Sequence, residues 1–396
     1  MNHIRRRENF LTNQIDKLGI ISLISSIGFS LVGTIWAIYL ESLLHNPSYV
    51  GFVMTLFSII AGVSYIAFIP IIEKNKKTKI YLITLILYFI SYLLFSVIPF
   101  IWAVIILGCL VSVVASLRVT SFGIILRDKS KDKDVSKNVG LIYTFLNTAW
   151  LIGPLIAGFV AERLGMRSVF LIAAALILIS TILFKIFQIK DNRTEKKIDK
   201  NVIKILIDFL KDKDRRLIYI ISGGITVWWV LIYTYIPIYI IKSGLTSSVV
   251  GYFLALIIVP LILLEYFFGK LTAKIGFKKI FFIGYLIPAI LAILCFFMPN
   301  LYLSLGLLIL ASIGMAMLEP TTEAYLMDIL KKNERDKYYG PYNTTINVNH
   351  TVATFLIAII LLALPFKFIF IFISAMMFFF ALISLKIKNI IEGKKR

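Results

Sequence analysis

Apolar stretches of about 20 residues, the length of helix that spans the hydrocarbon core of a bilayer, recur from Leu18 almost to the C-terminus. They constrain the fold more than any other feature. The chain of 396 residues is 59% hydrophobic, whereas soluble domains are roughly 45–50% apolar. We therefore expect an all-α membrane protein with twelve transmembrane helices. The predicted spans are 18–40, 49–72, 79–98, 101–126, 138–160, 168–189, 216–241, 248–269, 278–298, 301–327, 338–364 and 367–387.

The basic residues are distributed unevenly around these spans. The formal net charge is +21, and of the 42 Lys and Arg residues 36 fall on the side that carries both termini, against 4 on the other side. An excess of Lys and Arg marks the cytoplasmic segments of membrane proteins. The pattern predicts a multi-pass protein in the lipid bilayer of the cell (plasma) membrane, with both termini cytoplasmic. The charge is thus a topology signal, and we expect no nucleic-acid partner.

The sequence gives no sign of a metal or cofactor site. Cys109 and Cys295 lie in different spans, which argues against a disulfide framework and against a metal site. The first apolar run is too long for the core of a signal peptide and lacks a small-residue cleavage site. An ATP-binding loop of the form GxxxxGK(S/T) is missing. We expect no metal and no cofactor, and a proton gradient as the driving force.

The chain divides at its one long connection between spans. We expect a cytoplasmic tail at 1–17, a six-helix bundle at 18–190, a cytoplasmic linker at 191–215, a second six-helix bundle at 216–388 and a cytoplasmic tail at 389–396. Apolar residues of the connection recur at helical spacing opposite Lys and Asp, at Ile198, Val202, Ile205, Leu206 and Phe209. This pattern predicts an amphipathic helix that lies on the inner membrane surface.

The two halves match at a constant offset of 200 residues. The matching pairs include Thr34 and Thr234, Gly51 and Gly251, Pro99 and Pro299, Asp128 and Asp328, and Asn147 and Asn347. Six spans separate matching positions, and because six is even the repeat is parallel. Two parallel six-helix halves place a substrate site between them, near the bilayer midplane. We therefore expect a central cavity.

A loop motif after the second span of each half carries a family resemblance. The second half reads Gly269-Lys270-Leu271-Thr272-Ala273-Lys274-Ile275-Gly276-Phe277-Lys278-Lys279, and the first half has Glu73 followed by Lys74 and Lys77. This resembles Gly-x-Leu-x-Asp-(Arg/Lys)-x-Gly-(Arg/Lys)-(Arg/Lys), a motif of the major facilitator superfamily, although Ala273 replaces the acid and the first half lacks both glycines. The resemblance covers nearly the whole chain and implies the superfamily fold.

The same resemblance implies a cytoplasmic gating latch. Its members would be Glu73, Lys74, Lys77, Asp128, Gly269, Gly276 and Lys279. Glu73 would face the start of span eleven, where a helix N-terminus attracts an anion, and Lys77 or Lys79 would meet Asp128. A solvated loop that serves only membrane topology is the alternative.

The fifth span, within Gly140–Gly165, resembles the antiporter motif of the superfamily, Gly-x8-Gly-x3-Gly-Pro-x2-Gly-Gly. The matching positions are Gly140, Ala149, Gly153, Pro154, Ala157 and Gly158, and the second half lacks them. Members that carry the motif are mostly exporters, many of them drug/proton antiporters, so the resemblance implies efflux. The alternative is a face of small residues that lets a neighbouring helix pack closely.

Ionisable residues inside a span each need a partner or a function, because insertion penalties are roughly 2.5–3.5 kcal/mol. Arg118 resembles a loose form of the Arg-x-x-x-Gly motif of the superfamily, which is implicated in proton transfer. Glu319 and Glu323 share a helical face, and the offset of 200 places Glu319 at the depth of Val119, beside Arg118. We expect a charge pair between the halves that opens in one conformation. Glu265 is expected to snorkel to the membrane surface.

Span eleven is the most polar span, and lipid cannot satisfy its polar side chains. We predict that Asn343, Asn347 and Thr351 of this span face the central cavity, as does Asn147 of span five. His350 titrates near neutral pH and is a candidate proton carrier together with Arg118, Glu319 and Glu323. A hydrogen-bonded packing histidine is the alternative for His350.

Aromatic residues are concentrated in spans one, five and seven. Spans one and seven line the cavity in the superfamily that the chain resembles. The resemblance therefore implies that the cavity is lined by Trp36, Trp150, Trp228, Trp229 and Tyr235. They would make an apolar, aromatic pocket for amphiphilic or cationic solutes. Contact with lipid is the alternative for each of them.

Together these features predict a secondary active transporter and not an enzyme. It would export a small amphiphilic or drug-like solute in exchange for protons, by alternating access, as a monomer. Uptake or uniport of a nutrient, or lipid flipping, on the same fold stays open. A membrane sensor, or an enzyme with His350 as a base, is a further alternative.

Overall fold

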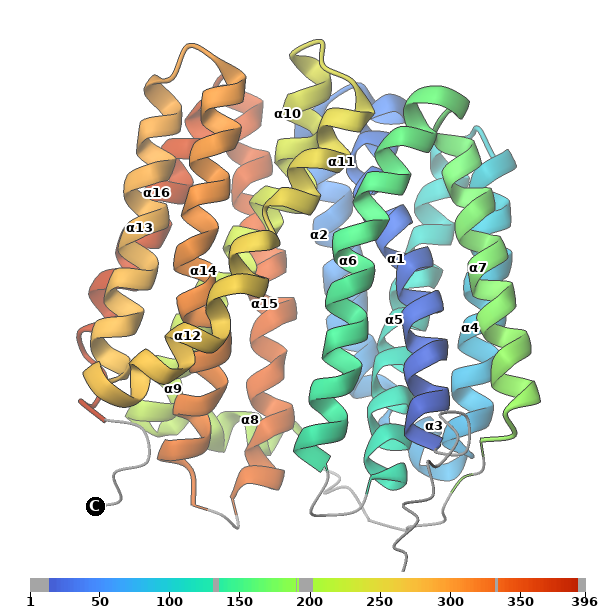
Figure 1. Cartoon of the computed structure of the whole chain (residues 1–396), viewed down its shortest axis with the longest axis horizontal. Coiled ribbons are helices and arrows are strands. Elements are labelled where there is room, and N and C mark those ends of the chain that lie inside the picture. Colours follow the sequence, from blue (N-terminus) through green and yellow to red (C-terminus); the bar gives the residue numbers. More distant parts are fainter. Residues whose placement is uncertain (1–13, 131–134, 190, 192–201, 332–333, 391–396) are drawn as a thin grey trace, which may run out of the picture.

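The computed structural model describes residues 14–130, 135–189, 191, 202–331 and 334–390. All twelve predicted spans are helical in it (Figure 1). Eleven helices of the described residues are long and apolar enough to cross a membrane, and Phe368–Ser384 is a shorter apolar helix. The predicted all-α membrane fold is therefore confirmed.

The helices form two groups that lie side by side (Figure 1). The first group is α1 (Gln14–Leu44), α2 (Pro47–Ala67), α3 (Ile69–Lys74), α4 (Lys77–Val97), α5 (Ile101–Lys129), α6 (Val135–Leu164) and α7 (Met166–Ile186). The second is α9 (Lys213–Val230), α10 (Ile236–Lys242), α11 (Ser247–Leu256), α12 (Val259–Ile275), α13 (Phe277–Phe297), α14 (Leu301–Ile329), α15 (Arg335–Ala363) and α16 (Phe368–Ser384). A π-helical turn, Leu231–Tyr235, joins α9 to α10, and α8 (Val202–Lys211) belongs to the connection between the groups.

Two of the predicted spans consist of two helices each. The second span breaks at Phe68, and α3 starts with Ile69 and Pro70. The eighth span breaks between α11 and α12, and Pro260 lies in the first turn of α12. Proline lacks the backbone donor that a helix interior needs, but the first turn tolerates it. The breaks change the direction in which the following side chains point.

Each half has its own apolar core. Buried residues of the first half include Leu85, Phe170 and Ile177, and those of the second include Phe281, Met315 and Ile373. In the first half α1 packs on α6 and α7, and in the second α13 packs on α14 and α16. Because nearly all buried apolar side chains belong to one core or the other, each half is stabilised separately.

The largest contacts between the halves join α2 to α15 and α6 to α11, with smaller ones between α1 and α10. Figure 1 shows α10 and α11 beside α6 at the top of the view. The backbones of α6 and α11 approach closely at two glycines, since a Cβ added to Gly158 would lie 3.0 Å from the Cα of Gly251. Small residues permit such close packing of membrane helices. These contacts join the halves near the ends that carry few basic residues.

The predicted amphipathic helix of the linker exists as α8, although Ile198 lies outside the described residues. Phe209 is fully buried, with its ring 5.7 Å from that of Tyr338 and 6.2 Å from that of Tyr219. Ile207 is 53% exposed. The helix therefore packs its apolar face on α9 and α15, whereas the sequence suggested that this face rests on lipid. The aromatic residues at the ends of α9 and α15 supply the alternative apolar surface.

A polar cluster fixes α8 to the start of α15. Asp208 accepts hydrogen bonds from the Tyr338 hydroxyl at 2.6 Å and from Lys337 at 3.0 Å. These two bonds lower the pKa of Asp208 from its usual 3.8 to about 2. The guanidinium of Arg215 lies 4.3 Å from the centre of the Tyr338 ring and donates to the backbone oxygen of Asp208. The cluster ties the linker to the second half.

Replacing Asp208 with asparagine is expected to loosen α8. The lowered pKa means that the stabilisation is complete above pH 3.8 and is lost as the pH falls through about 2. Hydrogen exchange of the α8 amides should be faster in the variant than in the wild type at neutral pH, and acidification to pH 4 should leave the wild-type helix protected. Lys211→Gln, an exposed change on the same helix, is the control. Equal protection in D208N and the wild type would contradict the role of this cluster.

Candidate functional site

A cavity of about 910 Å³ lies between the two halves. It extends to Tyr143 near the start of α6 and to Tyr339 near the start of α15, which are 56% and 37% exposed. These helix starts carry the basic loops, whereas the contacts between α6 and α11 lie toward the other end. The cavity is thus closed by packing at one end and reaches the surface near the other.

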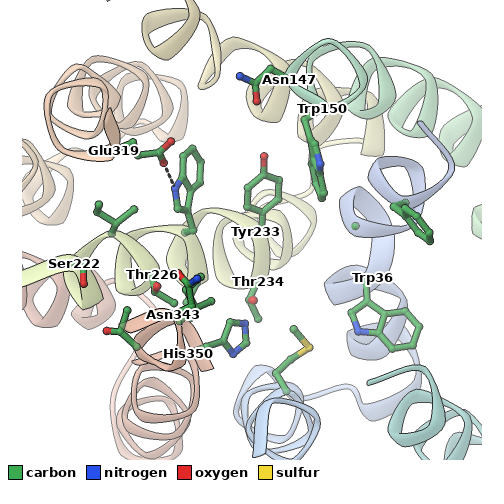
Figure 2. Close-up of a pocket in the computed structure, with 18 of the residues that line it drawn as sticks. Trp36, Asn147, Trp150, Ser222, Thr226, Tyr233, Thr234, Glu319, Asn343 and His350 are labelled. Atoms are coloured by element: carbon green, nitrogen blue, oxygen red, sulfur yellow. Dashed lines mark hydrogen bonds between the residues drawn. The ribbon is translucent and has the colours of Figure 1, made fainter. Parts of the chain in front are cut away.

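Nine of the residues predicted for the cavity line it. They are Trp36, Arg118, Asn147, Trp150, Trp229, Glu319, Glu323, Asn343 and His350. Figure 2 shows Glu319 on one side, Trp36 on the opposite side, and Tyr233 and Trp150 between them. The predicted residues that line the cavity are thus charged, polar and aromatic, and they come from both halves.

Three carboxylates line the wall that the second half contributes. Glu319 accepts a hydrogen bond from the indole nitrogen of Trp229 at 2.5 Å (Figure 2), and Glu323 accepts one from the Tyr339 hydroxyl. The third is Glu265 of α12. The expectation that Glu265 snorkels to the membrane surface is wrong, because α12 turns this side chain into the cavity.

Arg118 of α5 is the cation of the opposite wall. Its guanidinium lies 4.1 Å from the centre of the Phe29 ring and 5.8 Å from that of Tyr88. The Nε atom is buried and lacks a hydrogen-bond partner among the described residues. The predicted ion pair with Glu319 is not formed here, because Arg118 stacks on rings of the first half while Glu319 is bound to Trp229 of the second.

The aromatic lining differs in part from the prediction. Trp36, Trp150 and Trp229 line the cavity, and so does Tyr233, whose ring lies 5.3 Å from that of Trp150. Trp228 and Tyr235 do not line it, because both are fully buried in helix contacts, and Tyr235 lies beside Gly51 of α2. The Tyr235 hydroxyl donates to the backbone oxygen of Thr354 at 2.9 Å. The π-helical turn between α9 and α10 changes the direction in which the side chains after it point. Turns of this kind are frequent at functional sites.

The polar face of span eleven is divided between the cavity and α2. Asn343 and His350 line the cavity, and the Nδ1 atom of His350 is buried with no partner in the described structure. Asn347 and Thr351 do not line the cavity, contrary to the prediction. Thr351 donates to Ser58 of α2 at 3.0 Å, and Ser58 donates to the backbone oxygen of Asn347 at 3.1 Å. These two residues instead hold the halves together.

Further polar contacts close the end of the cavity that carries few basic residues. Lys242 of α10 and Glu41 of α1 form an ion pair at 3.0 Å. The backbone nitrogen of Ser248, at the start of α11, donates to Glu162 of α6 at 3.3 Å. Both contacts cross between the halves, so opening this end requires that they break.

Reversing the charge at Glu41 is expected to weaken the closed arrangement. Glu41→Lys places two cations together, and Lys242→Glu in the same chain should restore the pair. The Lys242 side chain is 40% exposed and that of Glu41 14%, so we expect a coupling of about 1 kcal/mol or less, as for other pairs near the surface. A double-mutant cycle of thermal unfolding midpoints measures it. Strict additivity of the two changes would show that the pair contributes nothing.

A cavity between two parallel six-helix halves, closed at one end, invites comparison with known proteins. The model of the Major Facilitator Superfamily matches residues 18–264 and 242–390. The chain belongs to this superfamily. It is thus a multi-pass membrane transporter of the major facilitator type. The predicted superfamily is confirmed, and the matches do not identify an efflux branch within it.

Individual proteins agree with this assignment. An uncharacterised MFS-type transporter of Methanocaldococcus jannaschii is 22% identical over 343 residues, which cover 85% of this chain and 88% of that protein. A POT family transporter in complex with 5-aminolevulinic acid is similar in structure, with a TM-score of 0.79, 12% identity, and coverage of 94% of this chain and 95% of that chain. A mutant of the nucleoside transporter NupG is also similar in structure, with a TM-score of 0.79, 12% identity, and coverage of 94% of this chain and 99% of that chain. The structural matches support the fold.

Most residues that resemble the superfamily antiporter motif lie in helix contacts, whereas a Cβ added to Gly140 would meet no atom within 4 Å. Ala149 and Ala157 are fully buried, and a Cβ added to Gly153 would overlap with Ser30 of α1. The Ser30 hydroxyl donates to the backbone oxygen of Ala149 at 3.0 Å. Gly158, after Pro154 within the same helix, faces α11. The motif therefore packs α6 on α1 and on the second half.

The loop motif of the superfamily is partly described. Gly276 has φ of +85° between α12 and α13, a conformation that favours glycine. Lys77 donates to the backbone oxygen of Asn75 at 3.1 Å, and Asp191 accepts from both the backbone nitrogen and the hydroxyl of Thr78. The side chain of Glu73 lies outside the described residues. The latch with Asp128 stays a prediction, as does a role for Lys74, Gly269 or Lys279.

Proposed function

We propose that this transporter exports a small amphiphilic solute in exchange for protons. The observation that carries the proposal is the position of Glu319, a carboxylate in a cavity between halves that are packed together at one end only. Aromatic side chains on both walls, among them Trp36, Trp150 and Trp229, offer contact area for an apolar body. An ionisable group in such a place is by default a functional one.

The coupling residues are Glu319 and Glu323, which take up and release protons. Arg118 tunes their proton affinity through its charge when the halves approach, and His350 is an additional carrier at the same cavity. In the opposite conformation the ion pair of Arg118 with Glu319 would form. The exchange of the Trp229 hydrogen bond for this ion pair would link proton binding to the movement of the halves.

The basic loops would face the cytoplasm in the cell membrane. The cavity then reaches the cytoplasmic side, and the packed end with Gly158 and Gly251 faces outward. Alternating access would separate α6 from α11 and α2 from α15 while the basic ends close. The transporter works as a monomer in this proposal, since the cavity is lined by the two halves of one chain, and it uses the proton gradient in place of a cofactor.

The test is a proton-indicator assay in proteoliposomes. Vesicles that contain the purified protein and a trapped pH-sensitive dye are given a panel of amphiphilic cations, zwitterions and anions. A solute that is exchanged for protons changes the internal pH in a saturable way. Failure of the whole panel to move protons, with the same rates as in protein-free vesicles, would argue against the proposal.

Uptake is the second candidate, because known structures with this fold include transporters named for peptides and nucleosides. The superfamily motif in α6 favours export, through resemblance alone. The sign of the pH change separates the two. Exchange moves protons opposite to the solute, whereas symport moves them together.

A further inference from the structure

The charges of the cavity are separated onto opposite walls. Arg118 belongs to α5 of the first half, whereas Glu265, Glu319 and Glu323 belong to α12 and α14 of the second. The repeat places Glu319 at the level of the residue beside Arg118 along the membrane normal. The cavity therefore carries opposite charges on walls that belong to different halves.

The cationic wall has no carboxylate of its own. Arg118 forms no ion pair with any described acidic residue, and its guanidinium rests on the faces of Phe29 and Tyr88. A ring face attracts a cation but does not neutralise its charge. A guanidinium at membrane depth without a counter-ion is expensive, so an anionic group that enters the cavity would gain a strong, bidentate partner.

The anionic wall is also incompletely paired. Glu319 has one neutral donor, Trp229, and Glu265 has no hydrogen bond or ion pair to any residue in the described ranges. Three carboxylates face one arginine, so the cavity carries two carboxylates in excess. Glu319 and Glu265 can meet a cationic group of a solute, and Glu323 remains available for protons.

Between the charged walls the lining is aromatic. Trp150 and Tyr233 lie between Glu319 and the Trp36 side of the cavity in Figure 2, and Trp229 stacks 5.5 Å from Tyr233. A molecule that reaches from Arg118 to Glu319 therefore needs an apolar middle.

We propose that the solute is a zwitterionic amphiphile, with its anionic group on Arg118, its cationic group on Glu319 and Glu265, and its apolar body against the aromatic residues between them. The inference rests on the proposed transport function and names its substrate class. It is narrower than the amphiphilic or cationic solute that the sequence suggested, because a cation alone would leave Arg118 unpaired.

The test measures binding to the wild-type protein in nanodiscs by titration calorimetry, with empty nanodiscs as the blank. The probes are ω-aminohexanoic, ω-aminooctanoic and ω-aminoundecanoic acids, which carry their two charges at the ends of an apolar chain. The amines and carboxylic acids of equal length carry only one of the charges. We expect the best zwitterion to bind at least about tenfold more tightly than its single-charge analogues, since truncating one member of a desolvated charge pair has at least that effect.

Variants assign each end of the probe. Arg118→Gln should remove the advantage of the zwitterion over the amine while the amine still binds. Glu319→Gln should weaken both the amine and the zwitterion and leave the carboxylic acid unchanged. Lys185→Gln, which removes an exposed cation of α7 outside the cavity, is the matched control. Arg118→Lys tests whether a positive charge alone is sufficient for the preference for the zwitterion. Elution as a single species verifies that each variant is folded.

Three results would overturn the inference: equal binding of amine and zwitterion to the wild type, an undiminished zwitterion preference in R118Q, or no binding by any member of the series. A transport measurement distinguishes a failure of the zwitterion proposal from a failure of the proposed proton-coupled transport. Proton exchange driven by amines alone would leave the function intact and remove the zwitterion, whereas tight zwitterion binding without proton movement would do the reverse.

Discussion

Glu319→Gln is expected to abolish gradient-driven accumulation of the solute, while exchange of solute for solute continues at solute concentrations raised to offset the weaker binding. A glutamine keeps an oxygen for the Trp229 indole but cannot carry a proton. With a gradient of about two pH units, a one-for-one exchanger can concentrate the solute at most roughly 100-fold on one side of the membrane, because each pH unit corresponds to a factor of ten. In the variant, the solute concentrations on the two sides should stay nearly equal. Counterflow of labelled solute without a gradient measures the exchange that remains.

Glu334→Gln is the control for this prediction. It removes a carboxylate at the start of α15 that accepts from the backbone nitrogen of Lys331 and lies outside the cavity. It should keep the accumulation of the wild type. If E319Q accumulates solute as well as the wild type does, Glu319 is not the coupling residue.

The second large effect is expected at Gly158. A leucine there has no room, since even a Cβ would lie 2.6 Å from the backbone oxygen of Ser247 and 3.0 Å from the Cα of Gly251. Overpacking of this kind has an energetic penalty of about 1–3 kcal/mol, which is roughly a 5- to 150-fold shift between two conformations. Gly158→Leu should therefore favour the state in which α6 and α11 are apart.

A cysteine in place of Tyr233, in a background without Cys109 and Cys295, reports the shift toward the conformation in which α6 and α11 are apart. A membrane-impermeant thiol reagent should reach this position from the basic side in the parent protein and from the opposite side after Gly158→Leu. Gly140→Leu is the matched control in the same helix, because a Cβ there meets no atom within 4 Å. Unchanged labelling from both sides would mean that the contact of α6 with α11 does not control access.

The sequence predicted the helices well, because the length of an apolar run is set by the thickness of the bilayer and needs no tertiary information. It also placed Arg118, Glu319 and His350 in the cavity, because charged and polar groups in a span must face protein or water. These predictions depend on the membrane as a solvent and not on packing detail.

Two of the errors concern side chains at or after an interruption of a helix. Tyr235 is the last residue of the π-helical turn, and Glu265 follows the break between α11 and α12. A period of 3.6 residues assumes an uninterrupted helix, so it misplaces such side chains. Trp228 precedes the turn, and the sequence did not distinguish it from the adjacent Trp229.

The span-eleven stripe illustrates a second limit. Its polarity requires a partner, and Thr351 finds one in Ser58 of α2, in the other half, while Ser58 donates to the backbone oxygen of Asn347. Only the relative position of the halves determines whether such a face meets solute or protein.

The most direct measurement of the central claim is the direction of solute accumulation in proteoliposomes under an imposed pH gradient, with a zwitterionic probe that binds. The account predicts saturable accumulation on the acidic side, because an exchanger moves solute opposite to protons, and predicts that inverting the gradient inverts the accumulation. Uptake that ignores the gradient, or that equals the rate of protein-free vesicles, would contradict proton-coupled transport. Accumulation on the alkaline side would contradict exchange and identify symport.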